Sequence, residues 1–191
     1  MTDSVKEGVG KRERLVQSAT ALFHEQGVHR TTIAEVAEHA DVPVGNVYYY
    51  FKTKDELLGA VLDGYQAQAA ALIDSFGRGR TPQARLKALV RNWIEMRDAV
   101  VRHGCPMGTL CAELEKSENG LDREAAKVMA MIIDWSEGQF RQLGRQDARD
   151  LALALFAGIQ GAALLANTFR DPTILNRQGR HLERWIDSLA S

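Results

Sequence analysis

The stretch from Arg30 to Phe51, RTTIAEVAEHADVPVGNVYYYF, decides the fold. Its first apolar residues recur at the spacing of a helix: Ile33, Val36, Ala37 and Ala40. Either Thr31 or Thr32 can cap the start of such a helix with its hydroxyl group. The pattern therefore predicts a short amphipathic helix over residues 32–40.

A second short helix is predicted directly after the first. Proline disfavours the helical conformation in the residue before it, so Asp41-Val42-Pro43 ends the first helix. Pro43 itself suits the first turn of a helix, here predicted over residues 43–50. Two short helices joined by a tight turn form the helix-turn-helix pattern, whose second helix can enter the major groove of DNA.

The flanking segments complete a small helical domain. Residues 11–27 place four apolar residues on one stripe and end in a glycine: Leu15, Ala19, Leu22, Phe23 and Gly27. After Phe51, Thr53 can cap a further helix that runs to about Phe76. We expect a flexible arm at 1–10, a three-helix DNA-binding domain at 11–54, and a connecting helix and linker at 55–80.

The remainder of the chain, residues 81–191, also reads as helical. Its predicted helices are Pro82 to His103, Met107 to about Ser117, Leu121 to Leu143, Asp147 to Phe169 and Pro172 to Leu189. No segment alternates convincingly between apolar and polar residues at period two. The predicted fold is all-α, with about nine helices: the N-terminal three-helix bundle and a larger C-terminal antiparallel helical domain.

Composition and charge limit the possible classes of protein. The chain has 191 residues, 45% of them hydrophobic, and a formal net charge of −1, which gives no support to nucleic-acid binding. The longest apolar run, Leu151 to Ala166, is interrupted by Gln160 and is too short to span a bilayer. Residues 1–10 lack the apolar centre of a signal peptide, and two cysteines are no disulfide framework. We therefore expect a soluble, cytoplasmic protein with no membrane partner.

Residues 11–57 resemble the DNA-binding domain of the TetR family of bacterial transcriptional repressors. The matching positions are Phe23, Gly27, Thr31, Thr32, Ile33, Gly45, Tyr48, Phe51, Lys54 and Leu57. Pro43 and Val44 depart from the family pattern, which often has a hydroxyl residue and then a polar or basic one there. The resemblance implies a regulator that binds double-stranded DNA, pairs through its last two long helices and responds to a small-molecule inducer.

The predicted DNA-binding residues are Thr31, Thr32, Val44, Gly45, Asn46, Tyr48, Tyr49 and Lys54. Asn46 could hydrogen-bond an adenine edge, Val44 could contact a thymine methyl group, and Gly45 permits close approach. Tyr48, Thr32 and Lys54 suit phosphate contacts. The alternative is that the three adjacent tyrosines pack inside the bundle, although on one short helix they point in three directions and cannot all be core.

A palindromic operator read by a two-fold dimer would supply the contact area that one small domain lacks. The helix predicted around Leu151 to Ala166, LALALFAGIQGAALLA, is apolar nearly all round and must be buried on several sides. The predicted homodimer interface is Phe156, Ile159, Gly161, Ala162, Leu165, Leu182, Trp185 and Ile186. The alternative is an internal core helix with no role in pairing.

Apolar residues in the middle of the chain could line an inducer cavity. The predicted set is Trp93, Met96, Cys105, Met107, Leu110, Cys111, Leu114, Met129, Ile133 and Phe156. Each of them could equally be ordinary core, so the expectation of a cavity rests mainly on the resemblance. We expect no cofactor.

Cys105 lies in the segment Gly104-Cys105-Pro106-Met107-Gly108, which resembles the inter-helix segment of TetR-type regulators that sense electrophiles or oxidants. His103 and Arg102 could lower the pKa of its thiol group. The alternative is a small buried residue at a tight turn. Cys105 and Cys111 are six positions apart, which matches no usual zinc spacing, so no metal site is predicted.

Sequence motifs of the common enzyme classes are missing, among them G-x-S-x-G, H-E-x-x-H and the phosphate-binding G-x-x-x-x-G-K-[ST]. The interpretation that the sequence favours is a homodimeric repressor, not an enzyme, that a small-molecule or thiol-reactive inducer releases from a palindromic operator. The alternative is a helical small-molecule-binding or catalytic protein whose N-terminal bundle docks a partner.

Overall fold

The structure, a computed structural model, describes residues 10–77, 81–115 and 120–189, and these residues form helices and connections without a strand. The helices are α1 (Lys11–Gln26), α2 (Ile33–His39), α3 (Val44–Tyr50), α4 (Lys54–Ser75), α5 (Pro82–Glu95), α6 (Arg97–His103), α7 (Pro106–Leu114), α8 (Leu121–Gln142), α9 (Ala148–Phe169) and α10 (Thr173–Ser188). The all-α prediction is confirmed. Predicted residues 116 and 117 lie outside the described residues.

One predicted helix is divided in two. The stretch from Pro82 to His103 breaks at Met96, which ends α5 and begins α6. The break redirects the chain: α5 packs against α10 and α8, whereas α6 packs against α9. This division gives ten helices in the described part of the chain, where about nine were expected.

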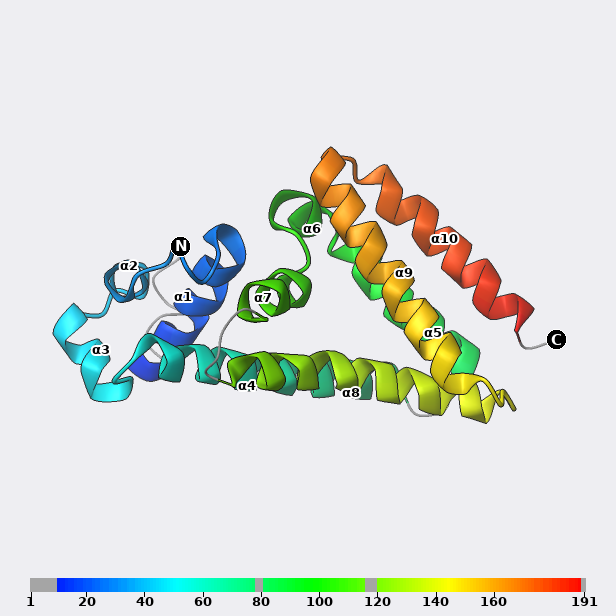
Figure 1. The fold of residues 1–191 in the computed structure, drawn as a ribbon, viewed down its shortest axis with the longest axis horizontal. Helices are drawn as coiled ribbons and strands as arrows, with labels where there is room; N and C mark the ends of the chain where they lie inside the picture. Colours follow the sequence, from blue (N-terminus) through cyan, green and yellow to red (C-terminus); the bar gives the residue numbers. More distant parts are fainter. Residues whose placement is uncertain (1–9, 78–80, 116–119, 190–191) are drawn as a thin grey trace.

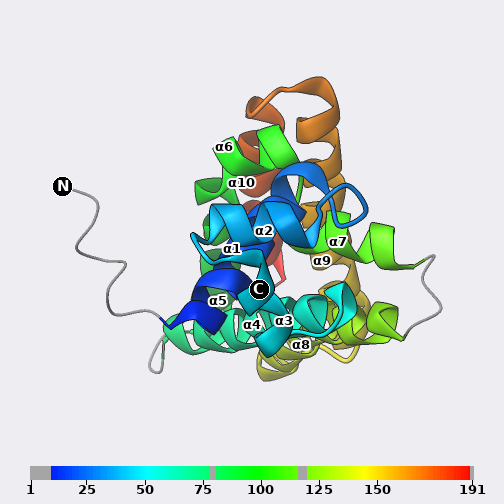
Figure 2. The ribbon, with the colours of Figure 1, turned by 90° about the vertical axis from the view of Figure 1, so that its left-hand side faces the viewer.

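The helices form a small head at one end of an elongated body (Figure 1). α1, α2 and α3 make up the head. α4 leaves it and lies beside α8 along one edge, and both views show this pairing (Figure 2). α9 and α10 form an antiparallel pair at the other end, with α5 packed against α10. α6 and α7 fill the space between the head and α9, where both contact α1.

Two clusters of buried apolar side chains stabilise this arrangement. The head cluster includes Leu15, Phe23, Val36, Val47 and Leu57, and it extends into the body through Leu110 and Leu114 of α7 and Ala125 of α8. The body cluster is built from α4 through α10, and it includes Leu86, Phe140, Leu155 and Ile186. The head therefore packs on the body as well as being covalently joined to it.

α9 is long and apolar enough to cross a membrane by length and composition alone. In the fold, however, α9 packs against α6, α8 and α10, and its inner side supplies Leu155, Ile159 and Ala163 to the body cluster. These contacts are those of a core helix in a helical protein.

Candidate nucleic-acid interface

Local hydrogen bonds fix the turn between α2 and α3. The Val42 N–H donates to Ala37 O over 2.9 Å, and the Asp41 N–H donates to Glu38 O over 3.0 Å. Asp41 has a φ of 53°, a left-handed conformation that aspartate tolerates better than most residues. Val42 then enters the head cluster, so the turn sets the angle at which α3 leaves α2.

α3 presents most of its side chains to solvent. Val47 is fully buried and anchors the helix on the head cluster, while Tyr50 is half-buried. The exposed residues of α3 are Val44, Gly45, Asn46, Tyr48 and Tyr49. The Tyr49 side chain is the most exposed of the large hydrophobic ones, at 79%. Of the three tyrosines, therefore, none is a core residue, and two point outward with Asn46.

The two threonines before α2 are used within the protein. Thr31 is 1% exposed, and its hydroxyl donates to Gly27 O over 2.7 Å, which stabilises the turn after α1. Thr32 caps α2 through a reciprocal pair of hydrogen bonds with Glu35. Only Thr32 is at the surface, so a phosphate contact by Thr31 would require the turn to open.

Lys54 also has a partner within the protein. Its ammonium group donates to Val28 O in the turn between α1 and α2, and it lies 6.0 Å from the centre of the Phe23 ring. Burial lowers the pKa of Lys54, and the carboxylate of Glu113 opposes that shift. Lys54 therefore joins the start of α4 to the turn after α1, and a phosphate contact would have to compete with that bond.

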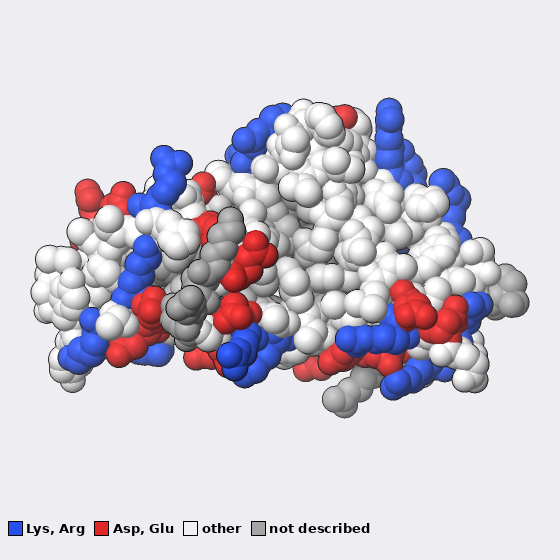
Figure 3. Space-filling view, viewed as in Figure 1, with Lys and Arg blue, Asp and Glu red and all other residues white. Residues whose placement is uncertain are grey.

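The exposed cations of the head are few and are accompanied by nearly as many acids. Residues 11–54 hold six Lys and Arg against five acids. Lys11, Arg12, Arg30 and Lys52 are exposed, and the Lys52 ammonium donates to Tyr48 O over 2.7 Å. Figure 3 shows the α3 end of the molecule largely white, with basic and acidic side chains interspersed beside it. Phosphate contacts would therefore have to come from single cations, because the described residues of the head form no broad basic surface.

The predicted dimer residues divide between the core and the surface. Phe156, Ile159, Ala162, Leu182 and Ile186 are buried within one chain, Trp185 is half-buried, and Gly161 and Leu165 are exposed. The exposed side of α9 is nevertheless an apolar stripe at helical spacing: Leu153, Ala154, Ala157, Gly161, Leu164, Leu165 and Phe169. Leu164 is 67% exposed, which is unusual for a leucine in a packed helical pair.

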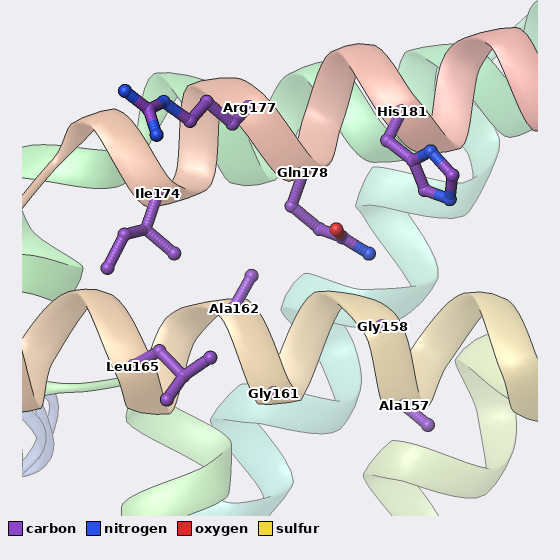
Figure 4. A pocket seen from close by; sticks show the side chains of 9 residues that line it. All are labelled: Ala157, Gly158, Gly161, Ala162, Leu165, Ile174, Arg177, Gln178 and His181. Carbon is purple, nitrogen blue, oxygen red and sulfur yellow. The ribbon is translucent and has the colours of Figure 1, made fainter.

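A groove of about 540 Å³ runs between α9 and α10 beside that stripe (Figure 4). Small residues of α9 form its floor, and Gln178 points into it from α10 with Arg177 and His181 on either side. The exposed side of α10 carries mostly polar and basic side chains: Arg177, Arg180, His181 and Arg184. The face therefore combines an apolar helix with a basic one.

Most of the predicted inducer residues are buried in one of the two clusters. Trp93, Cys105, Met107 and Phe156 belong to the body cluster, and Leu110 and Leu114 belong to the head cluster. Cys111, Met129 and Ile133 are half-buried, whereas Met96 is exposed. Trp93 lines a cavity of about 10 Å³ between α5, α9 and α10, which has room for about one water molecule.

Cys105 is a buried helix cap. Its side chain is at the start of α7, where Sγ accepts a hydrogen bond from the Gly108 N–H over 3.4 Å. Burial raises the pKa of the Cys105 thiol, so the prediction that His103 and Arg102 lower it is wrong. The pKa of Cys111 is also raised by burial, to about 11. Among the described residues, no group of three or more His, Cys, Asp or Glu side chains could hold a metal ion.

Two polar residues near Cys105 were not among the predicted site residues. Gln160 of α9 lies beside Cys105 and Gly108, and its buried Nε2 atom has no hydrogen-bond partner. Tyr65 of α4 is close enough for the Cys105 thiolate to influence its phenol, whose pKa burial raises to about 12. The signal for Gln160 was in the sequence, because it interrupts an otherwise apolar helix.

Comparisons with known proteins agree with this geometry. Residues 15–61 match the family of bacterial regulatory proteins, tetR family, and residues 82–181 match the C-terminal domain of LmrA/YxaF-like transcriptional regulators. An uncharacterised HTH-type transcriptional regulator of Mycobacterium tuberculosis is 30% identical over 185 residues, which cover 91% of this chain and 94% of that protein. The HTH-type transcriptional regulator TtgR of Pseudomonas putida is 24% identical over 188 residues, which cover 93% of this chain and 88% of that protein.

A solved structure shares the complete fold. The TetR transcriptional regulator from Legionella pneumophila superposes with a TM-score of 0.84 at 19% identity, covering 95% of this chain and 98% of its own. The relatives from Mycobacterium tuberculosis and Pseudomonas putida are both HTH-type transcriptional regulators, which favours that class over a catalytic or purely ligand-binding helical protein. The chain belongs to the TetR family of bacterial transcriptional regulators and carries its helix-turn-helix DNA-binding domain.

Proposed function

We propose that this protein is a cytoplasmic, non-catalytic repressor that binds a palindromic operator as a homodimer. The observation that carries the proposal is the presentation of α3: Val47 anchors the helix, while Asn46, Tyr48 and Tyr49 are exposed together. A helix held in this way can enter the major groove, where Asn46 is able to bond an adenine edge and Val44 a thymine methyl group. Tyr48, Thr32 and the surrounding cations then contact phosphates.

The exposed stripe of α9 supports pairing of two copies. An apolar patch on one edge of a helical protein is normally covered by a partner, and a two-fold axis would place the stripe of one chain against that of the other. Ala157 and Gly161 allow the two helices to approach closely, while Leu164, Leu165 and Phe169 supply the buried area. Pairing of this kind fixes the separation between the two α3 helices, as a palindrome requires.

An inducer would act by favouring a conformer whose α3 helices are wrongly spaced. Its effect on operator affinity can be no larger than its preference between the two conformers. The side chains around Cys105, Gln160 and Tyr65 suit a small ligand with an apolar body and a polar group, because a buried amide nitrogen there is unpartnered. A thiol-reactive inducer would act in the same way, by modifying Cys105 and so favouring that conformer.

Selection of bound duplexes from a random pool tests the proposal without knowledge of the regulated genes. The full-length protein is expected to enrich an inverted repeat whose half-sites are about one helical turn or more apart. Its binding should weaken steeply as salt rises. Enrichment of a single half-site, or of no sequence at all, would contradict binding of a palindrome by a two-fold dimer.

A further inference from the structure

The turn between α1 and α2, residues Gly27 to His29, is held from the body as well as from the head. The Val28 N–H donates to Glu113 Oε2 over 2.7 Å, and the His29 N–H donates to the same oxygen over 3.3 Å. Glu113 is on α7, 85 positions along the chain from Val28. The Val28 carbonyl in turn accepts from Lys54 at the start of α4. The Glu113 carboxylate therefore holds the N–H of Val28, and the Lys54 ammonium group holds its carbonyl.

The fit around Glu113 is close. A β-carbon on Gly27 would lie 2.7 Å from Glu113 Oε1, nearer than atoms can approach. Gly27 also has a φ of 90°, a conformation that glycine adopts readily. Glycine at residue 27 lets the Glu113 carboxylate lie against the turn without having to shift. The carboxylate then replaces the water that would otherwise solvate two backbone N–H groups.

α7 links the two packing clusters. At the start of α7, Cys105 and Met107 belong to the body cluster, and Cys105 lies beside Gln160 of α9. Later in the helix, Leu110 and Leu114 belong to the head cluster. A second polar contact is made beside it, where His24 Nε2 lies 3.0 Å from Gly104 O. A displacement at the start of α7 must therefore reach the head through these contacts, because packed helices move as rigid units.

We propose that Glu113 is the positioning residue through which α7 sets the orientation of the DNA-binding head. The inference rests on the proposed function for its consequence at DNA, but the contact itself can be tested in the free protein. Glu113 touches no nucleotide in this account. Its carboxylate holds the turn after α1, and the turn holds α1 and α2, on which α3 is anchored.

The test compares Glu113→Ala and Glu113→Gln with Glu115→Ala in the full-length protein. Glu115 is exposed just beyond α7, so its removal changes the charge equally without touching the turn. Amide hydrogen exchange at Val28 and His29 should quicken roughly ten- to a hundredfold in Glu113→Ala, because a charge-assisted acceptor is lost. Glu113→Gln keeps an acceptor and the packing, so it should fall in between. Exchange in α2 should not change.

Operator affinity supplies the second measurement, on a duplex selected by the wild-type protein. Removing an acid makes the net charge of the protein more positive and should by itself strengthen binding slightly, an effect that Glu115→Ala will measure. Glu113→Ala should instead weaken binding, by about tenfold, because a loosely held head loses more freedom on binding. Its salt dependence should stay that of the wild type, since no phosphate contact is removed.

The two measurements separate the possible failures. Faster exchange at Val28 and His29 together with weaker operator binding supports the proposal, whereas exchange equal to that of Glu115→Ala overturns it. Faster exchange with unaltered or tighter operator binding overturns the positioning role as well. If the wild-type protein selects no duplex, the proposed function fails, and the exchange result still decides whether Glu113 holds the turn.

Discussion

Thr32 and Glu35 close a reciprocal pair of hydrogen bonds at the start of α2. The Thr32 N–H donates to Glu35 Oε2 over 2.7 Å, and the Glu35 N–H donates to Thr32 Oγ1 over 3.2 Å. This capping box satisfies two backbone donors that the first turn of a helix leaves free. It also fixes where α2 begins, and hence the position of the turn that carries α3.

Loss of the cap should destabilise the head. Thr32→Ala is expected to lower the free energy of unfolding by about 1 kcal/mol, the usual cost of removing a threonine N-cap. Thermal or denaturant unfolding followed by circular dichroism measures it. Glu38→Ala, an exposed acid on the same helix, serves as the control and should leave stability unaltered. Equal stabilities of Thr32→Ala and the wild type would show that the box contributes nothing.

The cap should also respond to acid. Hydrogen bonds from Thr32 lower the pKa of Glu35 below its ordinary value of 4.5, so the folded state favours the carboxylate. Its contribution is present above the unfolded pKa and is lost as pH falls through the lower folded pKa. The stability difference between the wild type and Glu35→Ala should therefore be constant near neutrality and shrink below about pH 5. A difference that grows on acidification would contradict this assignment.

Neither cysteine should react quickly while the protein is folded. Burial raises the pKa of Cys105 and that of Cys111, the latter to about 11, so both are thiols rather than thiolates at neutral pH. Iodoacetamide labelling followed by peptide mass spectrometry should be at least about tenfold slower at pH 7.5 than in denaturant, and should quicken as pH rises. Native labelling of Cys105 at the denatured rate would instead favour direct sensing by this thiol.

Pairing should depend on the exposed stripe of α9. Leu164→Glu puts a charge where the proposed interface is apolar, so the protein should sediment as a monomer in analytical ultracentrifugation. Val44→Glu is the matched control, because it introduces the same change at an exposed apolar residue of α3. It should leave the dimer intact and impair DNA binding only. A dimer that survives Leu164→Glu would place the interface elsewhere.

Local signals made the head predictable. Thr32, Pro43 and Gly27 mark helix ends through conformations and hydrogen bonds that span only a few residues, and the observed helices begin and end within about two residues of the predicted ones. The body was harder, because the helical pattern of the sequence continues through Met96, where the structure divides it between α5 and α6.

The details of the site depend on contacts between distant residues. Lys54 and Thr31 bind the turn after α1, and Glu113 reaches the same turn from another part of the chain. Nothing local in the sequence marks these partners. The sequence also could not show which side of α9 faces outward, because a helix that is apolar all round has no polar face to identify it. Five predicted interface residues consequently lie in the core of one chain.

The central claim is that α3 reads DNA, and fluorescence anisotropy on the selected duplex tests it most directly. The double variant Asn46→Ala/Tyr48→Ala removes one proposed base contact and one proposed phosphate contact from the exposed side of α3. The control is Gln146→Ala, at an exposed residue of the connection between α8 and α9, and this connection lies at the opposite end of the molecule from α3 (Figure 1). The double variant should fold normally and lose at least about a hundredfold in affinity, whereas Gln146→Ala should bind like the wild type. Undiminished affinity in the double variant would contradict the assignment of α3 as the recognition helix.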